Sequence, residues 1–148
     1  MFVFSEEDFQ KIETVLEGRF RIEDICRRMV LENLEEKRKL SFEIYSNIPI
    51  GKKKGNLISV YTATTHLQLH FCSGFVVSEV LGEVTFVSQQ DGKLSGLIIE
   101  KGAACSLFAN VDSALLSGDF TKLGPEVMLS GIALSLTENL LPRRDAER

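Results

Sequence analysis

Two histidines, His66 and His70, come closest in this chain to the spacing of a metal site. On a helix, a separation of four residues brings two imidazoles to one side, which suits a shared metal ion. Here Leu67, Leu69 and Phe71 alternate with polar residues, which predicts a strand, and four strand residues span about 13 Å. Ligands of one zinc ion lie much closer together, because each Zn–N bond is about 2.0–2.1 Å. We therefore expect no metal, and take both histidines as candidate ligand contacts on one sheet face.

Cysteine chemistry is the second candidate. Cys72 lies two residues after His70 on the predicted strand, a spacing that places a thiol and a base on one face. A reactive thiol needs an electropositive setting, and no basic residue adjoins Cys72 in the sequence. Cys26 and Cys105 fall in apolar stretches and are interpreted as packing residues. Three separated cysteines without a C-x-x-C pair predict reduced thiols and a cytoplasmic protein.

The segment Gly51-Lys52-Lys53-Lys54-Gly55 is the densest basic cluster. It lacks the G-x-x-x-x-G-K-[ST] spacing of a phosphate loop, and no helix is predicted after it. At a hairpin tip, three lysines suit a phosphate, an RNA backbone or an acidic partner, although no aromatic residues interleave them as in single-strand binding platforms. Lysines also protect strand edges from aggregation. We take Lys52, Lys53 and Lys54 as further candidate ligand-binding residues.

Other catalytic signatures are missing from the sequence. G-x-S-x-G, H-E-x-x-H and G-x-G-x-x-G do not occur. A carboxylate pair for acid–base catalysis would have to form between strands that are distant in sequence. The scattered acids are Glu79, Glu83, Asp91, Glu100, Asp112, Asp119 and Glu126. We assign no catalytic residue and no cofactor, and expect a protein that is not an enzyme.

Length and composition limit the function classes. The chain has 148 residues, which fits one domain, and 44% of them are hydrophobic and 26% charged, as in globular proteins. A net charge of −4 argues against a nucleic-acid partner. No apolar run approaches the ~20 residues of a membrane span. The first residues lack a basic start and a long apolar stretch, so we expect no secretory signal.

Charge divides the chain into a solvated front and an uncharged body. Of residues 1–54, 22 are charged, against 11 of residues 55–140. In the front, Ser5 and Asp8 form a capping-box pattern, apolar residues follow at helical spacing, and Gly18 is placed to end the helix in a left-handed conformation. A second helix is predicted over 22–37, where apolar residues again keep helical spacing and acids precede bases by four positions.

From Leu40 onward the apolar period becomes two, which predicts strands. They cover 40–45, 57–63, 65–72, 75–87 (bent at Gly82), 93–100, 103–110 and 127–137, with loops at 47–56 and 88–92 and a helical turn at 112–117. Short connections favour antiparallel neighbours, because parallel pairs need long crossovers. We predict an α+β fold in which an N-terminal helical pair packs on a curved antiparallel sheet or partly closed β-barrel of six to seven strands. The domain spans 1–140, with helices over about 5–38 and strands over about 40–137, and 141–148 form a disordered tail.

The low charge of residues 55–140 leads to the functional hypotheses. An exposed sheet face normally carries charged residues, and charge depletion marks interface cores. We therefore predict a non-catalytic binding or adaptor domain that forms a homodimer, the commonest assembly. One alternative is a carrier that holds a small apolar ligand in a barrel cavity. Another is a cofactor-free enzyme that uses His66, His70 and a strand carboxylate at a dimer seam.

Overall fold

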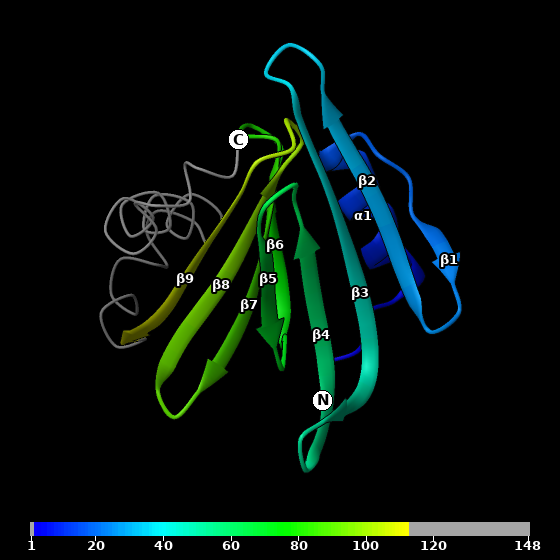
Figure 1. The fold of residues 1–148 in the computed structure, drawn as a ribbon. Coiled ribbons are helices and arrows are strands. Elements are labelled where there is room, and N and C mark those ends of the chain that lie inside the picture. The colour runs from blue at the N-terminus through cyan, green and yellow to red at the C-terminus, as the bar shows by residue number, and fades with distance from the viewer. Residues whose placement is uncertain (1, 113–148) are drawn as a thin grey trace.

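The computed structural model describes residues 2–112 (Figure 1). The helical turn expected after Asp112, the strand expected over 127–137 and the tail expected over 141–148 lie outside the described residues.

The described residues form one helix and nine antiparallel strands in two sheets. Helix α1 spans Glu6–Leu16; sheet A contains β1 (Arg21–Glu23), β2 (Cys26–Asn33), β3 (Arg38–Ile50), β4 (Lys53–Tyr61) and β5 (His66–His70); sheet B contains β6 (Gly74–Ser78), β7 (Glu83–Gln90), β8 (Lys93–Glu100) and β9 (Cys105–Asp112). Each strand pairs with its sequence neighbours within its sheet, so the antiparallel pairing is confirmed. The helical pair and the partly closed barrel are wrong, because α1 is the single described helix and the strands divide into two separate sheets.

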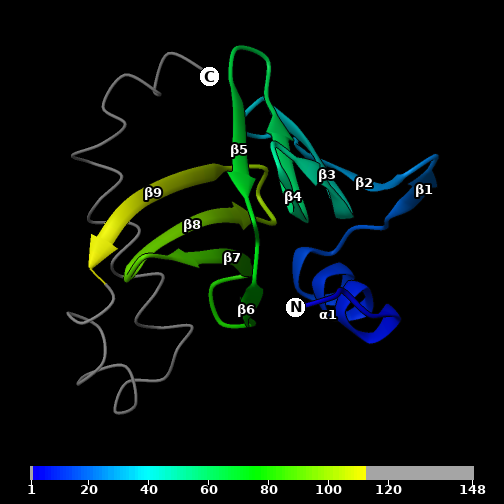
Figure 2. The ribbon, with the colours of Figure 1, turned by 90° about the horizontal axis from the view of Figure 1, so that it is seen from below.

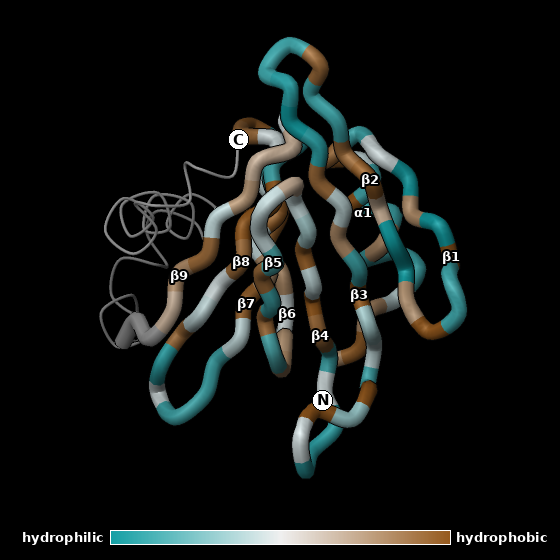
Figure 3. Tube along the Cα trace, in the orientation of Figure 1, coloured by the Kyte–Doolittle hydropathy of each residue, from teal (hydrophilic) through white to brown (hydrophobic). Residues whose placement is uncertain are grey.

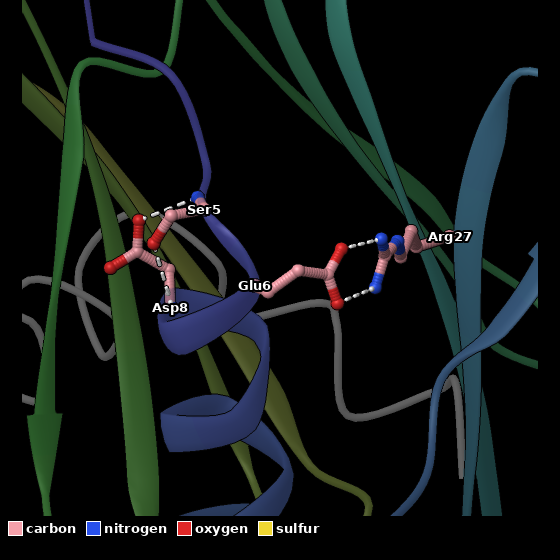
Figure 4. A network of polar contacts seen from close by, with 4 residues as sticks. All are labelled: Ser5, Glu6, Asp8 and Arg27. Carbon is pink, nitrogen blue, oxygen red and sulfur yellow. Dashed lines mark hydrogen bonds and ion pairs between the residues drawn. The ribbon is translucent and has the colours of Figure 1, made fainter.

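Helix α1 begins with the predicted capping box. The Oγ of Ser5 accepts the backbone N–H of Asp8 at 3.2 Å, and the Asp8 carboxylate accepts the backbone N–H of Ser5 at 2.9 Å (Figure 4). The helix ends at a left-handed residue, but this is Glu17 (φ 56°) rather than Gly18. Gly18 meets a different need: a Cβ there would lie 2.7 Å from the sulfur of Met29. The glycine lets β2 pass close to the end of the helix.

Residues 22–37, predicted as a helix, form the β1–β2 hairpin and the loop before β3. Asp24 (φ 53°) reverses the chain, and β2 then pairs with β3 along its whole length, from Cys26–Tyr45 to Asn33–Arg38. This ladder buries Met29 and Leu31 at alternate positions. A helix would instead have turned its apolar residues inward, yet four of them are exposed: Ile22, Ile25, Val30 and Leu34.

Arg27 joins β2 to α1. Its guanidinium forms an ion pair with Glu6 (Figure 4). It also lies 4.1 Å from the centre of the Phe9 ring. On the helix predicted over 22–37, Arg27 would follow Glu23 by one turn and pair with it. In the β1–β2 hairpin, Arg27 lies opposite Ile22 and Glu23 lies opposite Cys26, so the two side chains are on different faces of the sheet. The contact therefore holds the helix against sheet A.

Two hairpins differ from the expected boundaries. The loop expected over 47–56 is mostly strand: β3 and β4 continue to a turn at Gly51, and Asn47 (φ 51°) lies at a register shift between Tyr45 and Ile48. The single bent strand expected over 75–87 is two strands, because Gly82 (φ 65°) closes a turn between β6 and β7. The Asp-Gly turn between β7 and β8 is confirmed.

Phenylalanine rings fill the space between the sheets. Phe42 of sheet A and Phe86 of sheet B have ring centres 6.1 Å apart, and Phe4 stacks on Phe75 at 5.8 Å. Helix α1 lies on the inner side of sheet A and contacts β6 and β7 (Figure 2). This packing places one continuous apolar core between the two sheets and the helix.

Sheet B is buried on both faces. Phe86 points into the core, and the alternate residues Thr85, Ile98 and Phe108 are only 2%, 2% and 0% exposed. Hydrophilic residues instead concentrate on β1 and in the β2–β3 loop (Figure 3). The low charge of β7 and β8 thus agrees with their burial on both faces within one copy.

Candidate functional site

The face of sheet A that points away from the core carries both histidines singled out by the sequence. On β5, Leu67 and Leu69 are buried, while His66, Gln68 and His70 are exposed. The predicted strand is therefore confirmed, and the two histidines share its outer side. No described residues form a group of three or more side chains suited to a metal ion.

Strand register defines this surface, which we call the outer face of sheet A. Tyr61 lies opposite His66, Ser59 opposite Gln68, and Glu43 opposite Ser59. Antiparallel neighbours that face each other have side chains in contact range. The face includes Arg21, Glu23, Cys26, Arg28, Val30, Ser41, Glu43, Tyr45, Leu57, Ser59, Tyr61, His66, Gln68 and His70.

His66 is the best-held polar group of the outer face. Its Nε2 lies 2.8 Å from the Oγ of Ser59, and its ring stacks on Tyr61 with centres 4.4 Å apart and planes 9° apart. Ser59 is 1% exposed, whereas His66 is exposed. A serine–histidine pair is the start of a nucleophile and base, but catalysis also needs a group that orients the base. Among the described contacts no carboxylate bonds His66. The hydrogen bond to Ser59 therefore serves to hold the His66 ring in place against Tyr61.

Tyr45 and Glu43 form a second fixed pair beside it. The Tyr45 hydroxyl donates to the Glu43 carboxylate at 2.8 Å. Burial, followed by this carboxylate, raises the pKa of Tyr45 well above its ordinary value. Burial and then the charge of Glu43 also raise the pKa of Cys26. Both groups are neutral at physiological pH, so Arg21, Glu23, Arg28 and Glu43 are the charged residues beside them on the outer face.

Lys52, Lys53 and Lys54 lie elsewhere on sheet A. All three are exposed at the tip of the β3–β4 hairpin, where Lys54 pairs with Pro49. Leu57, opposite His70, is three residues farther along β4, about 10 Å at the usual strand rise. The lysines therefore extend from one end of the sheet, and the structure does not join them to the histidines in one pocket.

Cys72 is a core residue, and the pairing with His70 is wrong. Phe71 (φ 58°) ends β5 in the left-handed region, which reverses the alternation and turns Cys72 inward. The thiol is 3% exposed and donates to the carbonyl of Gly74 at 3.3 Å. Burial raises its pKa to about 11. A thiol with that pKa supplies almost no thiolate at neutral pH.

The sequence missed one carboxylate pair, on sheet B. Glu83 of β7 lies directly opposite Glu100 of β8. Burial and then the charge of Glu83 raise the pKa of Glu100, while Arg38 opposes this rise. The pairing depends on strand register, which leaves no signal in the local sequence. Glu79, which falls within the strand predicted over 75–87, lies in the turn between β6 and β7.

Comparison of the chain with known proteins adds no function to this geometry. No protein-family model, no curated protein and no solved structure matches the chain. Within residues 2–112, no helix has the length and apolar character needed to cross a membrane.

Proposed function

We propose that this chain is a non-enzymatic binding domain that works as a homodimer, joined through strand β1. The observation that carries the proposal is the sequence of that strand. β1 lies at the end of sheet A and pairs, among the described strands, with β2 alone. Its three residues are Arg21, Ile22 and Glu23, so a base and an acid lie symmetrically about one isoleucine.

This order makes β1 complementary to itself. Two β1 strands can pair in antiparallel fashion about a two-fold axis at Ile22. Arg21 of each copy then faces Glu23 of the other copy. Cross-strand pairs of opposite charge are favourable, whereas like charges directly opposite are not. Charged residues on a short edge normally prevent pairing with other strands. Here the same charges favour one partner, a second copy of this chain.

Exposed apolar residues beside β1 also favour association through this edge. Ile22 is 74% and Ile25 is 65% exposed, although both belong to the hairpin beside helix α1. They border a shallow cavity of about 290 Å³ that Phe4 and Phe9 also line. Pairing of two β1 strands brings two copies of this apolar surface together, and burial of apolar area favours association.

The dimer turns two outer faces into one binding surface. The two-fold axis of an antiparallel strand pair is perpendicular to the sheet, so both outer faces point to the same side. Tyr45, Tyr61 and His66 supply rigid aromatic groups, and Arg28 a cation, which are residue types enriched at protein interfaces. We propose a protein partner for this surface, and a reducing, cytoplasmic location for a chain whose Cys72 is a buried thiol.

The two other hypotheses find less support. A carrier needs an enclosed apolar cavity, but phenylalanine rings occupy the space between the described sheets. An enzyme built on His66 and His70 needs a cleft that excludes water, and both imidazoles are exposed. Strands β7 and β8, which are part of the charge-poor body, give no support to dimerisation either, because they are buried within one copy.

Charge reversal in β1 tests the dimer. By analytical ultracentrifugation we expect a wild-type dimer, monomers for Arg21→Glu and for Glu23→Arg, and a restored dimer for the double variant, in which opposite charges face each other again. Arg19→Glu, an exposed residue outside β1, is the control and stays dimeric. A wild-type monomer at 100 µM, or a double variant that stays monomeric, refutes the proposal.

The outer face has its own test. Proteins captured from a lysate are compared between the wild-type chain, Tyr61→Ala/His66→Ala and the control Lys11→Ala, which changes an exposed residue of α1. The proposal requires a partner that the control retains and the double variant loses. Equal capture by all three chains contradicts a binding role for this face.

A further inference from the structure

Three turns from both sheets meet at one end of the molecule. They are the β2–β3 turn, the β4–β5 turn and the β8–β9 turn (Figure 1). The side-chain amide of Asn33 and the Nε of Arg38 both donate to the carbonyl of Gly102, at 3.2 and 3.4 Å. These bonds tie sheet A to sheet B and fix the base of the Arg38 guanidinium.

A cavity of about 250 Å³ lies between these turns, and its charged residues are all basic. Its lining consists of Lys37, Arg38, Lys39, Thr62, Ala63, Ala103, Ala104 and Cys105. Three consecutive cations are concentrated around one hollow, and no carboxylate lines it. The hairpin tip at Lys52–Lys54 also has three consecutive cations, all exposed, which makes it a natural comparison.

The described part of the chain neutralises these cations only partly. Its ion pairs are Glu6–Arg27 and Glu17–Lys101, and neither involves the cavity. Glu100 is the carboxylate on which Arg38 acts. Glu32 lies opposite Lys39, and Glu35 and Glu36 precede Lys37 in the β2–β3 turn. None of these carboxylates lines the cavity, so the surplus of positive charge is confined to the lining itself.

We propose that this cavity binds a small phosphate-bearing anion, and that a phosphate monoester is its natural ligand class. Arginine offers five fixed N–H donors, of which Gly102 uses one, and its planar fork suits phosphate oxygens. Lysines on both sides supply point charges. Ala63, Ala103 and Ala104 line the remaining wall, and an alanine-lined wall suits a short organic group attached to the phosphate. The site does not depend on the dimer proposed above.

Calorimetric titration with inorganic phosphate, pyrophosphate and a simple phosphate monoester tests the site. We expect saturable binding of one anion per chain, weakened by about ten-fold or more in Lys37→Gln/Lys39→Gln, because hydrogen bonds between charged groups are lost. The control Lys52→Gln/Lys53→Gln removes the same charge from the hairpin tip and leaves the affinity within about two-fold of the wild type. Equal weakening in the two variants indicates only general attraction to a basic surface and overturns the proposal, as does a wild-type chain that shows no saturation.

Cys105 supplies a second readout inside the cavity. Its thiol is half-buried, whereas Cys26 and Cys72 are buried, so a neutral reagent such as iodoacetamide reports on Cys105 when the labelled peptide is identified by mass. We expect pyrophosphate to slow this alkylation at least about five-fold in the wild type and to have no effect in Lys37→Gln/Lys39→Gln, because a bound anion covers the thiol. Alkylation that is indifferent to saturating pyrophosphate in the wild type places the anion elsewhere and refutes the assignment.

Discussion

The contact between Phe42 and Phe86 is a direct test of how the two sheets face each other. Both side chains are fully buried, and their ring centres lie 6.1 Å apart with planes at 54°. Aromatic pairs at such separations contribute about 0.5–1.5 kcal/mol beyond the area they bury. Replacement of either ring by leucine keeps most of the volume and costs about 1 kcal/mol, which leaves the chain folded. The double variant is then less destabilised than the sum of the two singles by about 0.5–1.5 kcal/mol, because the pair is lost only once.

Urea unfolding of the four chains measures this coupling. Phe108 supplies the matched control: it is fully buried too, but it lies on the opposite face of sheet B, where its ring packs over Gly96. Phe42→Leu combined with Phe108→Leu is therefore additive within about 0.3–0.5 kcal/mol. Additive losses for Phe42 and Phe86, or an equal coupling for Phe42 and Phe108, would refute the described packing of the sheets.

Three further predictions concern single groups. Ser5→Ala removes the side-chain half of the capping box and lowers the free energy of unfolding by about 1 kcal/mol in urea titrations, with no effect on the strands. Cys72 stays unmodified by iodoacetamide at pH 8 in the native chain and reacts once urea unfolds it, because burial raises its pKa to about 11. Folding raises the pKa of Glu100, so its carboxyl favours the folded state when protonated and this contribution is lost as pH rises through the folded pKa. Glu100→Gln is therefore more stable than wild type at pH 7, and the gain shrinks at pH 4; an equal gain at both values contradicts the burial of this carboxyl.

Local signals predicted helix α1 and failed at the segment that follows it. The capping residues Ser5 and Asp8 act within one turn, so the sequence alone contains the cause of the helix start. The segment over 22–37 depends on β3 instead, because its backbone is paired with a strand that begins at Arg38. Apolar residues three and four apart are typical of a helix. The same spacing in 22–37 also fits a hairpin in which some of these residues lie exposed in turns. Long-range pairing decided between the two, and no local pattern records it.

The candidate site was predictable to the same extent. Alternation around His66 and His70 was enough to place both imidazoles on one sheet face. The Ser59 hydroxyl bonded to His66 lies on the neighbouring strand, and the register that joins them depends on the turn between β4 and β5. Cys72 was assigned to the wrong face because one left-handed residue, Phe71, reverses the alternation. A positive φ at phenylalanine has no signature in composition or spacing.

Scarcity of charge has a different meaning in the two sheets. In sheet B it follows from burial on both faces within one copy, so Thr85 and Ile98 need no partner to leave water. In sheet A the informative feature is the opposite: charge is present at the open edge, and its order about Ile22 is symmetric. Charge that repels most strands but matches its own reversed copy selects a partner as well as excluding others. Self-association is therefore predicted from the three residues of β1. The two single charge reversals, Arg21→Glu and Glu23→Arg, and the double variant test it directly.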